Sequence, residues 1–127
     1  MLISTTDRKL IAQAIKKSAE SNYKHKHGAL IYRGGSVMAC AANRSRNSAR
    51  HVDRGEATWH AEHAAIKSSG ATDGATIYVG RVTKGGAFAE SKPCEKCLRL
   101  IFMAGIKRVV YTVDGGIESA RIKTEEL

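Results

Sequence analysis

Four residues, divided between two short motifs, carry the most specific chemistry in this sequence. His60 and Glu62 stand two apart in the first motif, and Cys94 and Cys97 stand three apart in the second. One imidazole and two thiolates are preferred ligands of zinc. A structural zinc ion is normally closed by four protein ligands, whereas a catalytic one keeps three and leaves its fourth position to water. The sequence therefore predicts a catalytic site for one Zn²⁺ per chain, with Glu62 beside the ion as a carboxylate that is not a ligand.

The spacing of these residues predicts that they lie at the beginning of two helices. The segment from Ala61 to Ser69 is rich in helix-forming residues, so it places the imidazole and the carboxylate together at its first turn. Pro93 is expected at the first position of the second helix, where its missing N–H would be unpaired in any case. Cys94 and Cys97 then lie about one turn apart on one face. The positive N-terminal ends of both helices favour thiolates.

The remaining elements follow from hydrophobic spacing and from turn residues. Apolar residues at helical spacing predict an N-terminal amphipathic helix with Thr5 or Thr6 as its N-cap. Two short apolar runs joined by a Gly-Gly turn predict a hairpin, and the polar, basic residues 43–58 predict a loop. The expected elements are a helix over 7–21, strands over 28–32 and 37–42, the helix 61–69, a strand over 76–82, the cysteine helix from 93 to about 104, ended by Gly105, and a strand over 107–113.

The C-terminal segment can be interpreted in two ways. Asp114-Gly115-Gly116 stands between two strand-like runs, and Asp-Gly favours the tight turn of a hairpin. This makes the strand over 107–113 antiparallel to a further strand over 117–122, which is the interpretation we favour. The alternative is a short helix over 117–126.

The two motifs, His60-Ala61-Glu62 and Pro93-Cys94-Glu95-Lys96-Cys97, together resemble the H-x-E and P-C-x-x-C signature of zinc-dependent nucleobase deaminases. The sequence is similar to the cytidine deaminase-like superfamily, on the branch whose first ligand is His, over about residues 6–113. The resemblance implies an α/β fold of three layers, with a mixed sheet of about five strands flanked by helices and zinc between two helix N-termini. It also implies that zinc-activated water attacks C4 of cytosine while Glu62 carries the proton.

The metal motif does not decide between cytosine and adenine, so the pocket walls must choose the base. The resemblance places Asn43 against the sugar or base, although Asn at a strand end is also a common turn former. The backbone N–H of Ala61 could hydrogen-bond the substrate, and Trp59 could stack on a base or pack in the core. Ala64 stands where deoxycytidylate deaminases usually have Asn, and the role of His63 before it stays open.

A net charge of +9 favours a phosphorylated or polyanionic partner. Basic residues gather at Lys24–His27 and over 44–54, and in the second group Arg44 and Arg46 are expected to bind a substrate phosphate. The same loop could follow the backbone of single-stranded nucleic acid, or it could be a solvated basic surface. The lysines beside His25 and His27 argue against a second metal site there.

Length and composition predict a single catalytic domain over residues 1–127, with 43% hydrophobic residues. No stretch approaches the roughly 20 apolar residues of a membrane helix, and the N-terminus lacks the pattern of a signal peptide, so we expect a cytoplasmic protein that contacts no membrane. Three cysteines, of which two are expected metal ligands, leave no disulfide pair. The resemblance further implies a homo-oligomer.

Three functions remain open. The leading hypothesis is a zinc-dependent hydrolase that converts cytosine to uracil in a nucleoside or nucleotide, such as cytidine, deoxycytidine or deoxycytidylate. The second is a deaminase of cytosine or adenine within single-stranded DNA or RNA, including tRNA. The third is a zinc-stabilised binding module without activity, and Glu62 argues against it because a structural site has no use for an unligated carboxylate.

Overall fold

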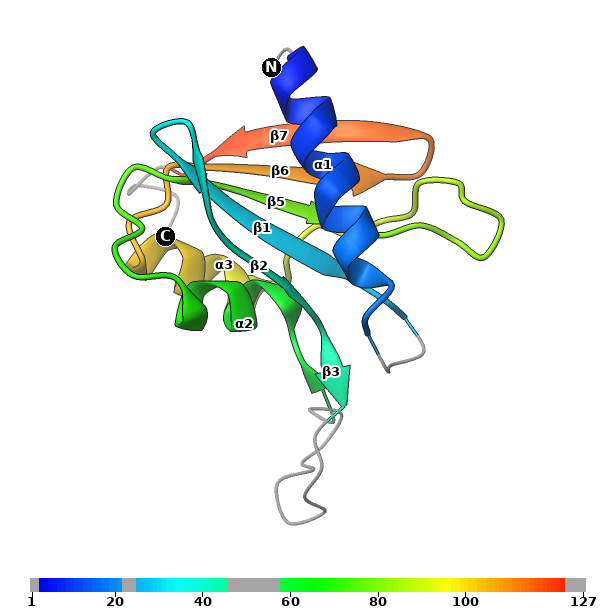
Figure 1. Cartoon of the computed structure of the whole chain (residues 1–127), viewed down its shortest axis with the longest axis horizontal. Coiled ribbons are helices and arrows are strands. Elements are labelled where there is room, and N and C mark those ends of the chain that lie inside the picture. Colours follow the sequence, from blue (N-terminus) through cyan, green and yellow to red (C-terminus); the bar gives the residue numbers. More distant parts are fainter. Residues whose placement is uncertain (1–2, 22–24, 46–57, 123–127) are drawn as a thin grey trace.

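The structure is a computed structural model that describes residues 3–21, 25–45 and 58–122, with only the backbone described at 44–45 and 58–59. These residues form a five-stranded sheet with helices on both faces and a separate two-stranded pairing (Figure 1). The helices are α1 (Thr5–Ser18), α2 (Ala61–Ser68) and α3 (Glu95–Met103). The strands are β1 (Gly28–Arg33), β2 (Ser36–Ala42), β3 (Arg44–Ser45), β4 (Thr58–Trp59), β5 (Thr76–Gly80), β6 (Arg108–Val113) and β7 (Gly116–Arg121).

The main sheet has the strand order β2-β1-β5-β6-β7. Strands β5 and β6 are parallel and are connected through α3, whereas every other neighbouring pair in the sheet is antiparallel. The turn between β6 and β7 contains Gly115 at a φ of 78°, a left-handed conformation that glycine adopts easily. The structure therefore confirms the mixed α/β sheet and the C-terminal hairpin, and the alternative helix beginning at residue 117 is wrong.

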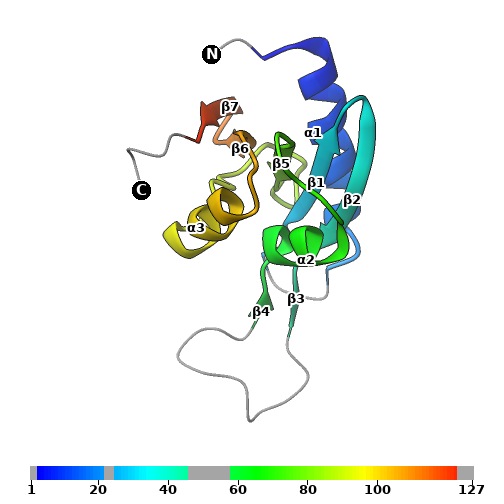
Figure 2. The ribbon, with the colours of Figure 1, turned by 90° about the vertical axis from the view of Figure 1, so that its left-hand side faces the viewer.

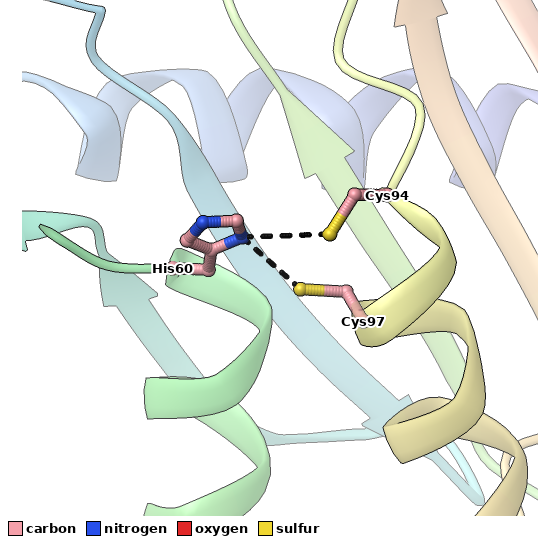
Figure 3. Close-up of side chains that lie close together, drawn as sticks. All are labelled: His60, Cys94 and Cys97. Atoms are coloured by element: carbon pink, nitrogen blue, oxygen red, sulfur yellow. Dashed lines mark hydrogen bonds between the residues drawn. The ribbon is translucent and has the colours of Figure 1, made fainter. Parts of the chain in front are cut away.

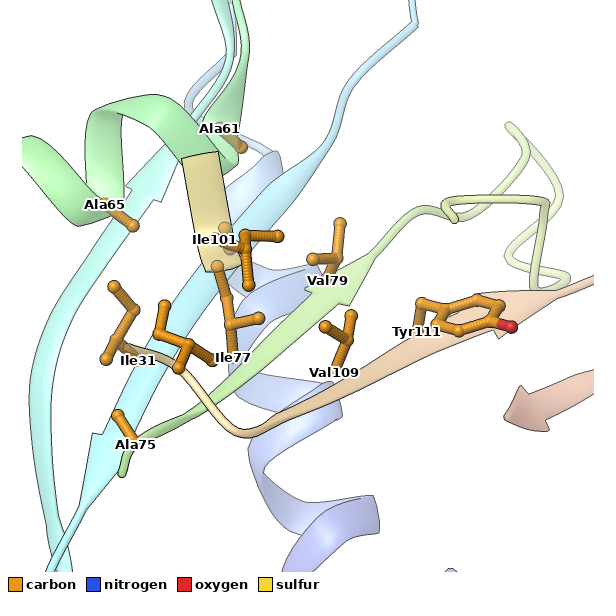
Figure 4. Close-up of a cluster of buried hydrophobic side chains, with 11 residues drawn as sticks. Ile31, Ala61, Ala65, Ala75, Ile77, Val79, Ile101, Val109 and Tyr111 are labelled. Carbon is orange, nitrogen blue, oxygen red and sulfur yellow. The ribbon is translucent and has the colours of Figure 1, made fainter. Parts of the chain in front are cut away.

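The molecule has three layers, with α1 on one face of the sheet and α2 and α3 on the other (Figure 2). Successive side chains of a strand point to opposite faces. On β5, Ile77 and Val79 pack with Ile101 of α3, while Tyr78 packs with Ile11 of α1. Figure 4 shows the first of these two clusters. Because both faces are covered, all the residues of β5 are buried.

Helix α1 begins with a capping box, which corrects the predicted N-cap. The Oγ of Ser4 accepts a hydrogen bond from the backbone N–H of Asp7, and the Asp7 carboxylate accepts one from the N–H of Ser4. Neither Thr5 nor Thr6 has an acidic residue three positions later, so neither can form this reciprocal pair. The helix also ends at Ser18, three residues before the predicted end.

Asp7 links α1 to the sheet as well. Both carboxylate oxygens accept hydrogen bonds of 2.9 Å from the Arg108 guanidinium, and the Tyr78 hydroxyl donates another of 2.8 Å. The side chain of Asp7 is only 4% exposed and that of Arg108 17% exposed, so water screens this ion pair weakly. The pair ties the start of α1 to β6.

Two paired glycines allow α1 to lie close to the sheet. Gly28 of β1 is opposite Gly80 of β5. A Cβ atom on Gly28 would overlap the carbonyl oxygen of Ala14, and one on Gly80 would lie 2.7 Å from Cγ1 of Ile15. Any larger residue at either position would therefore push the helix away from this edge of the sheet.

Strand β5 ends at Gly80, two residues before the predicted end. Beyond it, the N–H of Arg81 donates to the side-chain hydroxyl of Thr112 instead of continuing the ladder. Val82 forms only an isolated bridge with Phe88. The chain from 81 to 94 is thus a long connection that leads to α3.

The predicted loop over 43–58 is wrong at both of its ends. Strands β3 and β4 pair there, with Arg44 opposite Trp59, because an antiparallel ladder satisfies the backbone groups of both segments. Residues 46–57 lie outside the described part of the chain. At the end of α3 the C-cap is Ala104, one residue before the predicted Gly105. Gly105 follows it with a φ of 79°, and the N–H groups of Gly105 and Ile106 donate to the carbonyls of Phe102 and Ile101.

Among the described residues, no helix combines the length and the apolar character needed to cross a membrane.

Candidate active site

The three predicted metal ligands meet between the N-termini of α2 and α3 (Figure 3). The Nδ1 atom of His60 lies 3.2 Å from the Sγ of Cys97 and 3.9 Å from the Sγ of Cys94. All three ligand atoms lie within 4.8 Å of one another. Residues that are 34 and 37 positions apart in the sequence are thus brought to one point.

Two of these ligands occupy the same position relative to their helices. His60 is the N-cap of α2 and Cys94 is the N-cap of α3, both with extended backbone and neither with a side-chain capping bond. Their side chains are therefore directed to the metal site. Pro93 precedes the N-cap, so the prediction that it is the first helical residue is wrong, because the carbonyl of Cys94 already accepts the first helical hydrogen bond, from Leu98.

The donor set and its spacing fit a zinc ion. Zinc binds His nitrogen at about 2.0–2.1 Å and Cys sulfur at about 2.3 Å in tetrahedral geometry, which places neighbouring ligand atoms roughly 3.6 Å apart. The two measured N···S separations, 3.2 and 3.9 Å, lie on either side of this value. His60, Cys94 and Cys97 are thus positioned to bind one metal ion, and an imidazole with two thiolates suits Zn²⁺.

The surroundings of Cys97 favour a cation. The residue is 4% exposed, and burial raises the pKa of its thiol well above the ordinary value; the negative charges of Glu62 and Cys94 raise it further. A bound metal ion supplies the positive charge that stabilises such a thiolate.

Glu62 lies beside the ligands without joining them. It is 5% exposed, at the second position of α2, and it lines the pocket described below. Burial raises the pKa of its carboxyl group to about 7, although hydrogen bonds from its own backbone N–H and from Cys97 act in the opposite direction. A buried carboxylate next to a metal centre can accept and return a proton.

The metal ligands open onto a cavity of about 440 Å³. Its walls combine the ends of several strands with the first residues of the helices. The lining residues are His25, His27, Asn43, His60, Ala61, Glu62, Arg81, Ser91, Lys92 and Cys94.

Strand register explains why distant segments share this cavity. Gly28, at the beginning of β1, pairs with Ala42 at the end of β2 and with Gly80 at the end of β5. The strand ends therefore lie side by side at one edge of the sheet. The residues immediately beyond them are His27, Asn43 and Arg81.

Asn43 holds one wall of the cavity in place. It is 5% exposed, its Oδ1 accepts a 2.9 Å hydrogen bond from the N–H of His27, and its Nδ2 donates one of 2.7 Å to the carbonyl of His25. The side chain thus fixes the segment that precedes β1, and it faces the cavity at the same time.

The structure brings most of the predicted site residues together around this centre. These are His60, Glu62, Cys94, Cys97, Asn43 and Ala61. Arg44 and Trp59 are described only by their paired backbones, and Arg46 and Lys24 lie outside the described residues. His63 is half-buried and is not part of the described cavity lining.

Sequence reasoning missed three cavity residues, which lie in the connection after β5. Arg81, Ser91 and Lys92 all line the cavity. The Oγ of Ser91 donates to the carbonyl of Val79 over 2.9 Å and accepts a 2.9 Å bond from the N–H of Thr112, so this connection is fixed to two strands. Lys92 could have been found from its position two residues before a ligand, whereas Arg81 has no local signal.

Comparisons with known proteins agree with this geometry. The family model for the cytidine and deoxycytidylate deaminase zinc-binding region matches residues 4–113, which is most of the chain. Comparison with curated proteins gave no match.

Several solved structures have a similar fold. They include a dCMP deaminase from the cyanophage S-TIM5 in complex with dCMP and dUMP, with a TM-score of 0.66 and 24% identity over 87% of this chain and 83% of that one. A cytidine deaminase from Burkholderia pseudomallei gives a TM-score of 0.68 and 24% identity over 90% and 91% of the two chains. A cytidine deaminase from Mycobacterium leprae gives a TM-score of 0.57 and 15% identity over 91% of this chain and 94% of that one.

At these identities the structural similarity establishes the fold, while the family model accounts for the metal motif within it. A His-Cys-Cys centre between two helix N-termini, next to a buried carboxylate, occurs inside the matched region. The chain belongs to the cytidine and deoxycytidylate deaminase zinc-binding family.

Proposed function

We propose that this protein is a zinc-dependent hydrolytic deaminase that converts cytosine to uracil in a nucleoside or nucleotide. The observation that carries this proposal is the position of Glu62, a buried carboxylate that lines the cavity beside the metal ligands without belonging to them. A structural zinc site has no need of such a group, whereas hydrolysis needs a proton carrier.

In this proposal His60, Cys94 and Cys97 hold the zinc ion. When bound, zinc lowers the pKa of a water ligand to about 7 and so supplies a nucleophile at neutral pH. Cys94 is exposed and lines the cavity, which leaves access for water and substrate.

Glu62 is the proposed proton carrier. In the reaction a C4–O bond forms and the C4–N bond of cytosine breaks, so the amino group must gain a proton before it leaves as ammonia. The carboxylate takes the two protons of the attacking water in turn, gives one to N3 of the ring and the other to the departing amino group, so no other proton donor is required.

Two further residues are proposed to position the base. The N–H of Ala61 belongs to the first turn of α2, where N–H groups lack partners within the helix, and it can donate to the pyrimidine carbonyl. Asn43, which directly follows β2, has donor and acceptor atoms at the cavity wall. Trp59, Arg44 and Arg46 remain proposed substrate contacts.

We further propose that residues 1–127 act as one catalytic domain within a homo-oligomer in the cytoplasm. A second candidate function is deamination of cytosine or adenine within single-stranded DNA or RNA. The net charge of +9 favours this candidate, because it would attract a polyanionic strand.

A substrate panel tests the proposal. Purified, zinc-loaded protein is incubated with cytidine, deoxycytidine, their monophosphates, adenosine, guanine, and single- and double-stranded oligonucleotides, and ammonia release is measured. We expect turnover of the cytosine nucleosides or nucleotides. Turnover of oligonucleotides alone would favour the second candidate, and no turnover by fully loaded protein would refute both.

A further inference from the structure

The cavity has a positively charged wall that deamination of a base does not require. Arg81 and Lys92 both line it, together with His25 and His27. Glu62 is the one carboxylate among the described lining residues, and it belongs to the metal centre. The rest of the cavity therefore carries fixed positive charge without a matching acid.

The guanidinium of Arg81 is held in position from two sides. Its Nη1 donates to the backbone carbonyl of Glu90 over 3.5 Å, and its Nη2 lies 3.1 Å from Nδ1 of His25. Within the described ranges, no carboxylate is close enough to Arg81 to form an ion pair. These contacts occupy only part of its donor fork, so other N–H groups remain for a ligand.

Lys92 is fixed by its neighbours in the chain. The preceding residue, Ser91, is 3% exposed and hydrogen-bonded to Val79 and Thr112, and the following Pro93 is buried. Lys92 itself is exposed between these two anchors, with its side chain at the cavity. The two cations thus come from the two ends of one anchored connection.

His27 lies in the positively charged part of the cavity, next to Arg81. Burial lowers the pKa of its imidazole, the hydrogen bond with the backbone carbonyl of His25 acts in the opposite direction, and the positive charge of Arg81 lowers the pKa further. The imidazole of His27 carries no negative charge and cannot neutralise Arg81 or Lys92, so an anionic ligand would be stabilised beside it.

We propose that Arg81 and Lys92 form a phosphate subsite, so that the substrate is a nucleoside monophosphate and not a nucleoside. This inference rests on the proposed function, because the phosphate must belong to the molecule whose base is deaminated. A terminal phosphate carries close to two negative charges at neutral pH, which two cations can match, whereas the phosphodiester of a nucleic acid carries one. Arginine also binds phosphate oxygens in a bidentate manner, which fixes the orientation of the ligand.

The test compares binding and turnover. Deoxyuridine and deoxyuridine monophosphate are titrated into zinc-loaded protein by calorimetry, and kcat/KM is measured for deoxycytidine and its monophosphate. Replacing Arg81 by Gln should reduce the monophosphate's affinity and kcat/KM about 10- to 100-fold, mainly through KM, and the values for the nucleosides much less. R81K should recover part of this loss, since lysine keeps the positive charge but cannot bind phosphate in the bidentate manner of a guanidinium.

Lys84→Gln is the matched control, because Lys84 is an exposed cation of the same connection that does not line the cavity. Equal losses for nucleoside and monophosphate in R81Q would overturn the subsite and indicate a structural role. Tighter binding of a dinucleotide than of the monophosphate would overturn the choice of a terminal phosphate. If no substrate turns over but the monophosphate's binding advantage disappears in R81Q, the subsite is supported and the proposed function fails.

Discussion

The Nδ1 atom of His60 lies 3.2 Å from the Sγ atom of Cys97, across the gap between the beginnings of α2 and α3. An ion bound by both residues would connect two helices that lie on the same face of the sheet. Metal binding should therefore contribute to the free energy of unfolding as well as to activity.

Replacing Cys97 by Ala should abolish metal binding, because two ligands cannot hold zinc tightly. We expect the metal content, measured by elemental analysis, to fall from about one ion per chain to less than a tenth. The melting temperature should also fall, and a chelator should no longer change it. Cys40→Ala is the control: Cys40 lies on β2, outside the ligand cluster, so this variant should keep its metal.

Glu62→Gln should retain zinc and lose turnover. The amide has nearly the same shape as the carboxylate but cannot carry a proton, so kcat should fall about 10²- to 10⁴-fold. Metal analysis and steady-state kinetics on the same sample separate the two effects. Glu90→Gln removes an exposed carboxylate that does not line the cavity and should leave kcat unchanged. Full activity of E62Q would show that another group moves the proton.

Asp7 should make stability depend on pH in the acid range. Burial alone would raise the pKa of its carboxyl group, but hydrogen bonds from Arg108, Ser4 and Tyr78 outweigh burial and hold the pKa well below its ordinary value of 3.8. The stabilisation is therefore fully present above about pH 4 and is lost as the pH falls toward the lower, folded-state pKa.

Urea unfolding of Asp7→Asn tests this. At pH 7 the variant should lose roughly 3 kcal/mol of unfolding free energy, since Arg108 loses its charged partner, and the difference from the unmodified protein should narrow at pH 3. Glu20→Gln, which removes an exposed ion pair with Lys17, should change the free energy by less than about 1 kcal/mol. A difference for D7N that does not vary with pH would contradict the assigned role.

Gly28→Ala should destabilise the protein by about 1–3 kcal/mol, because the added Cβ would overlap the backbone of α1 at Ala14. Gly70→Ala is the matched control, since a Cβ on Gly70 would meet nothing within 4 Å. Thermal unfolding of both variants gives the comparison. Equal stability of the two would mean that α1 can move away from the sheet at little cost.

Local patterns were sufficient to predict much of this molecule. The positions of His60, Glu62 and the two cysteines follow from motif spacing, and the hairpin after β6 follows from an Asp-Gly turn, because each depends on neighbours in the chain. The errors at helix starts have one cause. An N-cap is defined by the hydrogen bonds that its side chain or carbonyl accepts from backbone N–H groups of the helix. The residue type alone did not distinguish Ser4 from Thr5, or Pro93 from Cys94.

Arg81 could not be predicted in the same way. Its place beside His27 and Asn43 depends on which strands are neighbours and on their register, with Gly28 opposite both Ala42 and Gly80. Long-range pairing of this kind cannot be predicted from the few residues that surround an arginine in the sequence. The position of Arg81 in the cavity wall therefore follows only from the strand order and register of the sheet.

Both ligand-bearing helices meet the cavity only at their beginnings. Residues 63–68 of α2 and 95–103 of α3 do not line it, and they include Met103, whose side chain is 80% exposed. The exposed side chains of these turns can therefore be replaced, for solubility or for attachment to another protein, whereas the buried Cys97, Ala65 and Ile101 must be kept. The groups that face the substrate and the exposed surface thus occupy different parts of the same two helices.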